Sequence, residues 1–324
     1  MSEAQPNTTT RSSRTLAAAL VGAIAISFSA IYFALSDVDP VIGAVFRQVY
    51  AIPVLAIIWW IGRRKDGRPG RRRWLAVGAG LMLGVDIVLW HVAIDFIGAG
   101  LATLIANSQV LWVGFGAWII HAERPTKRMM GAVPVVLVGV ALVSGIGQES
   151  AFGSNPLLGA VIALVAALFY SGFLLGFRAS NETFAPSAGP LFEASIGALL
   201  ASLVLGMFFG DGLDFTVTFP AHFWLMALGL TAQVFGWLLI GYALPRLPAV
   251  ETATIILLQP VLTMVWGAII FSESPSALQM LGAAIVLGGV GFVAISRGKR
   301  GKRLDQPALA AENEHEEHTG RPID

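Results

Sequence analysis

Ten long apolar runs, separated by short polar stretches, constrain the fold of this chain more than any other feature. They cover residues 16–35, 41–61, 74–97, 98–121, 129–147, 157–177, 188–210, 222–243, 249–271 and 277–296. A helix that crosses a bilayer needs about 20 apolar residues, so ten helices would use roughly 200 residues. The sequence therefore predicts an all-α membrane protein with ten transmembrane helices.

The composition agrees with a membrane setting. Hydrophobic residues make up 56% of the 324 residues and charged residues only 13%, whereas a soluble domain has about 25% charged residues. The chain has no cysteine, which excludes disulfides, cysteine-ligated zinc and cysteine nucleophiles. Basic clusters flank the apolar runs, where membrane topology explains them, so we expect no nucleic-acid partner.

Two features of these runs need interpretation, namely the length of the first run and the junction between the third and fourth. The first, after Arg11 and Arg14, is longer than a signal-peptide core of about 7–15 residues and has no convincing cleavage site. We expect a retained helix, with a cleaved signal as the alternative. The third and fourth runs meet at Gly98 and Gly100 almost without a loop. A helix break is predicted there, because the combined run is far too long for one span.

The distribution of charge predicts the orientation. With a cytoplasmic N-terminus and ten crossings, every lysine and arginine except Arg47 falls on the cytoplasmic side. The outer loops then hold only acids, namely Asp37, Asp39, Glu149, Asp211, Asp214 and Glu273. Because cytoplasmic loops are enriched in lysine and arginine, we expect a multi-pass protein of the inner (plasma) membrane with both termini in the cytoplasm.

An internal repeat divides the membrane region. At a constant spacing of 150 residues, the second half repeats the first in these pairs: Gln109 and Gln259, Glu123 and Glu273, Pro125 and Pro275, Met130 and Met280, Gly139 and Gly289. A shorter match, at a spacing of 146, pairs Gly43–Arg47 with Gly189–Glu193. Because each half has five helices, an odd number, the second half should enter the membrane inverted.

This repeat defines the expected organisation. A cytoplasmic tail covers residues 1–15, two five-helix repeats cover 16–148 and 157–296, and a polar tail covers 297–324. The last segment has too little apolar surface to order itself and is expected to be a disordered cytoplasmic tail. Inverted repeats are typical of transporters, with the substrate site near the midplane between the repeats.

Several motifs together resemble the EamA-type branch of the drug/metabolite transporter superfamily. They are the loop Glu123-Arg124-Pro125-Thr126, the stretch Leu247-Pro248-Ala249, the sequence Gln259-Pro260-Val261 and the loop Glu273-Ser274-Pro275-Ser276. The resemblance covers about residues 16–296 and implies transport of small solutes, often export, without ATP. Val110 stands where the second half has Pro260, which argues against a symmetric helix-breaking role for this position.

Charged groups inside the spans are candidate gates. Arg47 is the only cation within a span, while Asp95 and His91 lie four residues apart on one face of the next helix, at similar depth. These three residues could form a gating or anion-binding cluster, or a purely structural ion pair. Glu193 mirrors Arg47 in the second repeat. It could pair with Arg246 or Arg178, or reach water at the lipid interface.

Asp86 lies near the middle of its span and is the candidate for proton coupling. An isolated buried carboxylate is very costly, so this group should be protonated or paired. Protonation suits exchange of a solute against protons. The alternative is a neutral acid that hydrogen-bonds a neighbouring helix.

Neutral polar and aromatic groups at membrane depth complete the candidate substrate site. The expected set is Asp86, His91, Asn107, Gln109, Gln233, Gln259, Trp90, Tyr170 and Trp237. Gln259 is the strongest amide, because Pro260 frees a backbone carbonyl near it. The alternatives are hydrogen bonds between helices for the amides and core packing for the aromatic rings.

These observations predict a secondary transporter of small metabolites such as amino acids or related compounds, working by alternating access. The family resemblance alone implies export. The partners of the transporter would be a small-molecule substrate, the lipid bilayer and protons. No phosphate-binding loop or H-E-x-x-H motif is present, and neither a cofactor, a metal nor an enzymatic activity is expected. A membrane enzyme acting on a lipid, or a scaffold that does not transport, are the alternatives. One chain contains both repeats, so a monomer can be complete, which does not exclude a homodimer.

Overall fold

The computed structural model describes residues 8–121, 127–145, 148–180, 188–208, 213–243 and 249–292, and their regular structure is entirely helical. The elements are α1 (Thr8–Ser27), α2 (Ser29–Ser36), α3 (Pro40–Gly62), η1 (Arg63–Lys65), α4 (Gly70–Ala106), α5 (Gln109–His121), α6 (Lys127–Val143), α7 (Pro156–Ser180), α8 (Ala188–Gly206), α9 (Phe219–Ala227), η2 (Leu228–Gly236), α10 (Trp237–Ala243) and α11 (Ala249–Phe271). A last helix covers Ala277–Phe292. The predicted all-α class is confirmed.

Six helical stretches in the described residues are long and apolar enough to cross a membrane. They are Thr15–Ser36, Pro40–Lys65, Gly70–Ala106, Pro156–Ser180, Ala188–Gly206 and Phe219–Ala243. Two shorter apolar helices, Leu257–Phe271 and Ala277–Phe292, follow. The loop with Glu123 and Pro125, Arg246 and the C-terminal tail lie outside the described residues.

Local sequence signals explain where helices begin and break. Asp39 caps α3, because its carboxylate accepts the N–H of Val41 at 2.8 Å, and Pro40 follows at the first helical position. In α4 the helix breaks at Gly98, whose φ of 80° and ψ of 165° are not helical. Glycine adopts a positive φ without the strain that a side chain would cause. The break predicted from span length is thus confirmed.

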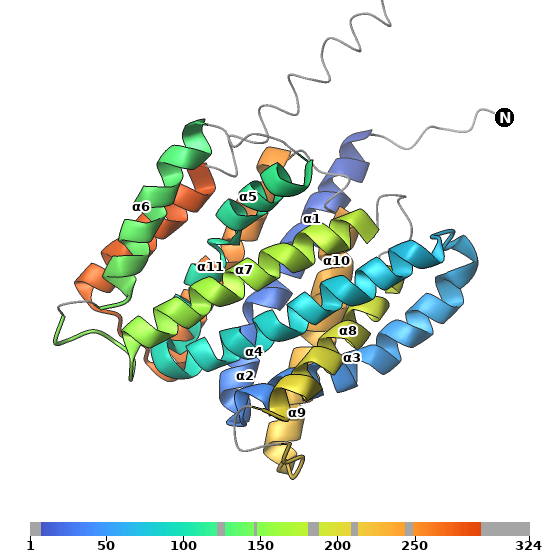
Figure 1. Ribbon diagram of the computed structural model, residues 1–324, viewed down its shortest axis with the longest axis horizontal. Helices are drawn as coiled ribbons and strands as arrows, with labels where there is room; N and C mark the ends of the chain where they lie inside the picture. Colours follow the sequence, from blue (N-terminus) through green and yellow to red (C-terminus); the bar gives the residue numbers. More distant parts are fainter. Residues whose placement is uncertain are drawn as a thin grey trace, which may run out of the picture.

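Helix α4 lies at the centre of the helix packing. In Figure 1, α4 and α7 run as long neighbours, with α8 beside them. A Cβ added at Gly80 would overlap the carbonyl group of Ala194 on α8, and one at Gly84 would overlap that of Ala198. Small residues therefore bring the backbones of α4 and α8 into direct contact, as they do between membrane helices generally.

A second pair of helices joins distant parts of the sequence. Figure 1 shows α6 lying beside the helix Ala277–Phe292 at one edge of the molecule. A Cβ at Gly139 would lie 2.8 Å from Val286, and one at Gly282 would lie 2.6 Å from the carbonyl oxygen of Gly139. The contact thus rests on glycines from both halves of the chain.

Candidate functional site

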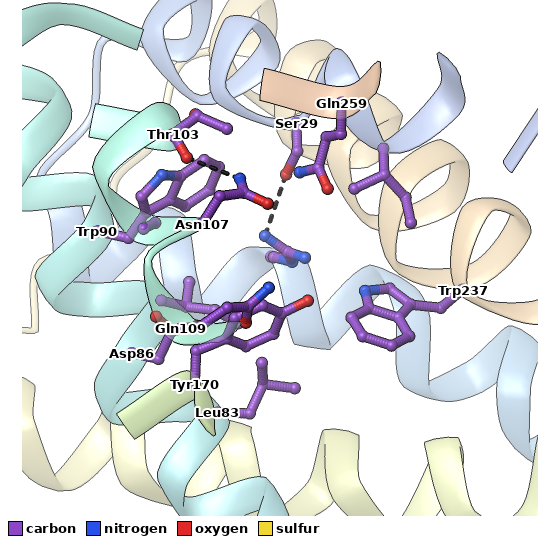
Figure 2. Close-up of a pocket in the computed structure, with 14 residues that line it drawn as sticks. Ser29, Leu83, Asp86, Trp90, Thr103, Asn107, Gln109, Tyr170, Trp237 and Gln259 are labelled. Carbon is purple, nitrogen blue, oxygen red and sulfur yellow. Dashed lines mark hydrogen bonds between the residues drawn. The ribbon is translucent and has the colours of Figure 1, made fainter. Parts of the chain in front are cut away.

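A cavity of about 60 Å³ lies between helices from both halves of the chain (Figure 2). Its lining residues are Ile26, Ser29, Arg47, Leu83, Asp86, Ile87, Trp90, Thr103, Ala106, Asn107, Gln109, Tyr170, Trp237 and Gln259. Eight of these were singled out by sequence as gate or substrate-binding candidates: Arg47, Asp86, Trp90, Asn107, Gln109, Tyr170, Trp237 and Gln259. Helices far apart in the sequence therefore bring most of the candidates into one place.

Arg47, on α3, is buried at the cavity wall with neutral hydrogen-bond partners. Its Nε donates to Oε1 of Gln233 at 2.9 Å, and its Nη1 donates to the hydroxyl of Ser29 at 3.1 Å. Asp86 is the acid that interacts with it electrostatically, without a direct ion pair in the described part of the chain. The guanidinium charge is thus held in place but not neutralised by contact.

The partner of Arg47 comes from a π-helical segment that the sequence did not reveal. η2 interrupts the path from α9 to α10 with the wider turn of a π-helix, a feature frequent at functional sites. A Cβ at Gly229 would lie 2.9 Å from the carbonyl oxygen of Arg47, so this segment packs closely on α3. Gln233, one turn later, is fully buried and reaches the guanidinium. Gln233 contacts Arg47 and is not among the described residues that line the cavity, and its expected role in solute binding stays a prediction.

Asp86 and three neutral groups form the oxygen-rich part of the cavity wall. Asp86 is 7% exposed and has no hydrogen bond to another described residue. The oxygens Oγ1 of Thr103, Oδ1 of Asn107 and Oε1 of Gln109 are also buried without a partner among the described residues. Buried polar atoms are nearly always hydrogen-bonded. Such a group of unpaired oxygens is therefore suited to a polar ligand or water.

Aromatic and aliphatic side chains form the rest of the wall. The rings of Tyr170 and Trp237 meet edge to face with centroids 6.3 Å apart, and Trp90 lies across the cavity beside Asn107 (Figure 2). Leu83 and Ile87 of α4 add aliphatic surface. The cavity thus combines one cation, one acid, unpaired oxygens and aromatic rings, which suits a small molecule with both polar and apolar parts.

The expected cluster of Arg47, Asp95 and His91 does not form. His91 is fully buried, stacks on Phe33 with centroids 3.7 Å apart, and its Nδ1 lies 3.1 Å from the carbonyl oxygen of Pro40. Asp95 is exposed. The prediction used depth along the helix, which says nothing of direction around it, and Arg47 reaches inward to α2 and η2 instead.

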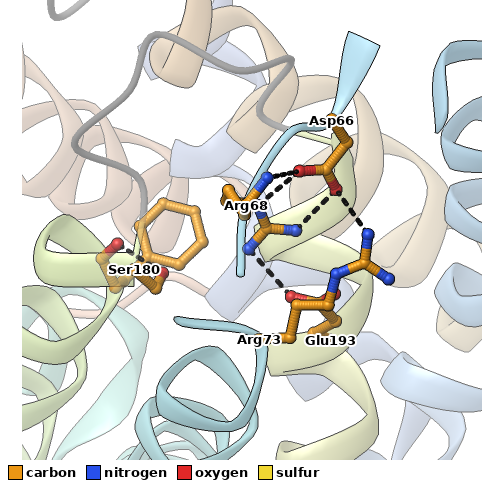
Figure 3. Close-up of polar contacts among 6 residues, drawn as sticks. Asp66, Arg68, Arg73, Ser180 and Glu193 are labelled. Carbon is orange, nitrogen blue, oxygen red and sulfur yellow. Dashed lines mark hydrogen bonds and ion pairs between the residues drawn. The ribbon is translucent and has the colours of Figure 1, made fainter. Parts of the chain in front are cut away.

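Glu193 lies in a separate ion cluster, shown in Figure 3. Arg68, in the connection between α3 and α4, donates from Nη1 to Glu193 at 2.9 Å and from Nε to Asp66 at 2.8 Å. Its side chain has no exposed surface. Of the two expected partners, Arg178 forms no ion pair with Glu193 among the described residues, and Arg246 lies outside them.

The electrostatics of this cluster favour its charged form. Burial alone would raise the pKa of the Asp66 carboxyl, but the hydrogen bond and charge of Arg68 outweigh burial and lower it. Arg73 adds a weaker attraction from 3.9 Å with a side chain that is 39% exposed. Sequence reasoning used Arg68 only as a cytoplasmic marker. Its position two residues after Asp66 and beside Pro69 was the signal for a structured turn.

Of the six lining residues that sequence reasoning missed, two are polar, Ser29 and Thr103. Thr103 lies one helical turn before Asn107, and its backbone carbonyl accepts the Asn107 amide at 2.8 Å. That spacing of four residues places both on one face and would have identified Thr103. Ser29 begins α2 directly after the interruption of the first span, a feature that hydropathy alone does not show.

Comparisons with known proteins agree with this architecture. The model of the EamA-like transporter family matches residues 13–145 and again residues 157–295. An uncharacterized transporter of Archaeoglobus fulgidus is 22% identical over an alignment that covers 84% of this chain and 95% of the relative's length. A protein of Salmonella typhimurium named "Probable amino-acid metabolite efflux pump" is 23% identical, over 67% of this chain and 75% of its own. A protein of known crystal structure shares the fold, with a TM-score of 0.57 and 18% identity over 89% of this chain and 98% of that one.

Proposed function

Because this multi-pass membrane protein belongs to the EamA-like transporter family, we propose that it is a secondary transporter that exports small metabolites, amino acids or related compounds, by alternating access. The family comprises transporters rather than enzymes. A relative named as an efflux pump for amino-acid metabolites supports both the direction and the substrate class.

The proposal rests above all on the cavity, where a buried cation and a buried acid face the same space without pairing directly. Arg47 has donors for a solute carboxylate. Asp86, with the unpaired oxygens of Asn107 and Gln109, offers acceptors for an ammonium group. An amino acid carries both groups, and the rings of the wall can contact its side chain.

Alternating access is supported by the size and position of the cavity. Its volume of about 60 Å³ is well below the roughly 300–1,000 Å³ of a typical ligand pocket, so a solute enters only if the helices rearrange. The wall combines α3 and α4 from the first family segment with α7, α10 and α11 from the second. A movement of one half against the other would therefore open and close it.

The proposed arrangement in the membrane is ten spans, built as two inverted five-helix repeats with both termini in the cytoplasm of the cell. The two matches to one family model support a duplication. The segregation of lysine and arginine supports the inversion and orientation. Labelling of single cysteines introduced into this cysteine-free chain, in intact cells, would test the orientation of each loop.

Proton coupling follows if solute and proton compete for Asp86. A protonated Asp86 has no charge for an ammonium group, whereas an ionised one attracts it. Binding of the solute and binding of the proton therefore exclude each other. A site that opens alternately to the two faces of the membrane then exchanges solute for proton. Competition of this kind needs only one carboxyl group, and Asp86 is the one acid among the described residues of the cavity wall.

The test is export from liposomes. The purified protein is reconstituted with an internal mixture of amino acids and small metabolites, and mass spectrometry follows efflux with and without a pH gradient. Gradient-dependent loss of one solute class is expected for the wild type. Asp86→Asn should remove the dependence on the gradient, whereas Asp214→Asn, the same change at an exposed position, should keep it. Wild-type efflux that ignores the gradient would refute the coupling, and no protein-dependent efflux would refute the transporter.

The alternative function, an enzyme that acts on a lipid, is not supported by the positions of His91 and Asp95. A lipid-acting enzyme would have needed His91 and Asp95 together, yet one is enclosed against Phe33 and the other is exposed. We propose that a monomer can be complete, because one chain supplies the described cavity wall; a homodimer is compatible with this.

A further inference from the structure

Glu273, in the loop between α11 and the last helix, reaches across to the break in α4. Its Oε1 accepts the backbone N–H of Ala99 at 2.6 Å, and its Oε2 accepts that of Gly100 at 3.1 Å. The residue is 9% exposed. A loop in the second half of the chain thus binds the backbone of the first half.

Three glycines leave the space that this carboxylate occupies. A Cβ at Gly98 would lie 2.7 Å from Oε1, one at Gly100 would lie 3.0 Å from Oε2, and one at Gly267 would overlap Oε2. Gly98 is also the residue whose positive φ breaks α4. The break, the close approach and the carboxylate therefore belong to one arrangement, which we call the Glu273 cap.

Further contacts fix the loop that carries Glu273. Gln279, at the start of the last helix, donates to the carbonyl oxygens of Val143 and Phe152, both at 3.1 Å. The hydroxyl of Ser276 donates to Gln148 at 2.6 Å. These hydrogen bonds attach the loop to α6 and to the connection between α6 and α7, and they hold the backbone that carries Glu273 in position.

The chemistry of a helix terminus explains what the cap does for α4. Residues 99–106 form a short helix after the break, and the first N–H groups of a helix have no partner within it. A carboxylate there satisfies two of them and interacts favourably with the helix dipole. Ala99 and Gly100 are both buried, so water is a poor substitute. Loss of Glu273 would leave these two N–H groups without their acceptor.

The other end of the short helix borders the cavity. Thr103, Ala106 and Asn107 line it, and Asn107 lies about 12 Å along the helix from Ala99 at 1.5 Å per residue. We infer that Glu273 is a positioning residue for the solute site: from the second half of the chain, it holds the short helix that carries Thr103 and Asn107. The role of this helix at a solute site rests on the proposed function, whereas the cap itself does not.

The experiment compares Glu273→Gln with Glu149→Gln. Glutamine at 273 keeps the size and one acceptor oxygen but turns the second acceptor into a donor facing an N–H group. Glu149 is an exposed acid in the neighbouring connection, so it controls for loss of charge. Glu273→Ala removes both acceptor oxygens and should have the larger effect. If the alanine variant fails to fold, Glu273→Gln still tests the cap.

The first readout needs no solute. Amide hydrogen exchange of the peptide containing Ala99 and Gly100, in detergent, should accelerate at least about tenfold in Glu273→Gln, because one of the two N–H groups loses its charged acceptor. Exchange should stay unchanged in Glu149→Gln. Equal exchange in both variants would overturn the cap as a restraint on this helix.

The second readout uses the amino acid that the wild type releases fastest from the liposome mixture. A displaced Asn107 should weaken binding more than turnover, so KM should rise at least about threefold in Glu273→Gln with a smaller change in kcat. A general folding defect would lower the amount of active protein and leave KM unchanged. An unchanged KM in a transporting Glu273→Gln protein would overturn the positioning role, whereas absence of wild-type transport would count against the proposed function alone.

Discussion

Arg47 and Glu193 hold corresponding positions in the two halves of the chain, at the ends of Gly43–Arg47 and Gly189–Glu193, yet their surroundings differ. Arg47 is bound by the neutral groups of Gln233 and Ser29 at the edge of the cavity. Glu193 is bound by Arg68, whose side chain also pairs with Asp66. One buried charge keeps its attraction for a charged ligand, while the other is neutralised by its own protein.

The difference separates a binding charge from a structural one. A charge held by neutral dipoles is positioned but not compensated. Its interaction energy becomes most favourable when an opposite charge enters the site. A charge in a paired network joins elements together, here α8 with the connection between α3 and α4. The comparison predicts that substitutions at the first region affect transport, and that substitutions at the second affect stability.

The largest expected effect is on stability, at Arg68. Arg68→Gln leaves two carboxylates without their main partner and should lower the free energy of unfolding by about 3–5 kcal/mol. Arg73→Gln, which removes a longer and half-exposed contact, should cost less than about 1 kcal/mol. Thermal unfolding in detergent measures both. Equal losses would mean that the cluster does not depend on its buried arginine.

Arg47 should give the next largest effect, on transport. Arg47→Gln removes the one cation among the described residues of the cavity wall and should lower kcat/KM by about 100-fold, or about 2.7 kcal/mol. Arg178→Gln, at an exposed arginine near the end of α7, should leave it unchanged. Liposome efflux at matched protein amounts provides the measurement. Retained transport in Arg47→Gln would remove the distinction between the two charges.

The pH dependence of stability should identify Asp66 as part of the structural cluster. Its pKa is lowered in the folded protein, so its contribution is present above the unfolded pKa of about 3.9 and is lost as the pH falls through the folded value. Asp66→Asn removes this contribution. Between pH 5 and pH 3 the melting temperature of the variant should therefore fall less than that of the wild type. An identical fall in both proteins would show that Asp66 is not held as an anion by Arg68.

The smallest effect is expected at Asp95. Because this residue is exposed and does not contact Arg47, Asp95→Asn should change both stability and transport by less than about 0.5 kcal/mol. Unfolding and efflux assays run beside Arg47→Gln measure the difference directly. A loss comparable to that of Arg47→Gln would restore the three-residue gate that the sequence suggested.

Sequence reasoning located the depth of the candidate residues in the membrane but not the direction in which their side chains point. Asp86, Asn107 and Gln109 were found because polar groups are costly within apolar spans. The break at Gly98 followed from span length. Hydropathy alone does not tell which neighbour a helix face meets, so Arg47 was grouped with Asp95 and His91, whereas its hydrogen bonds go to Ser29 and Gln233.

The remaining gaps have particular physical causes. Gln233 reaches Arg47 from a π-helical turn, which shifts a side chain in a way that regular helical spacing does not anticipate. Arg68 and Glu273 lie in loops, where they served only as markers of topology and repetition. Both act through tertiary contacts to helices far away in the sequence.

The central claim is that a solute binds between Arg47 and Asp86 and displaces a proton from the latter. Proton release on solute binding tests it most directly, measured in weakly buffered detergent solution with the amino acid that the liposome assay identifies. At a pH where the free site is protonated, the wild type should release close to one proton per bound solute, Asp86→Asn should release none, and Arg47→Gln should bind about 100-fold more weakly. Binding without proton release by the wild type, or unchanged binding by Arg47→Gln, would contradict the account.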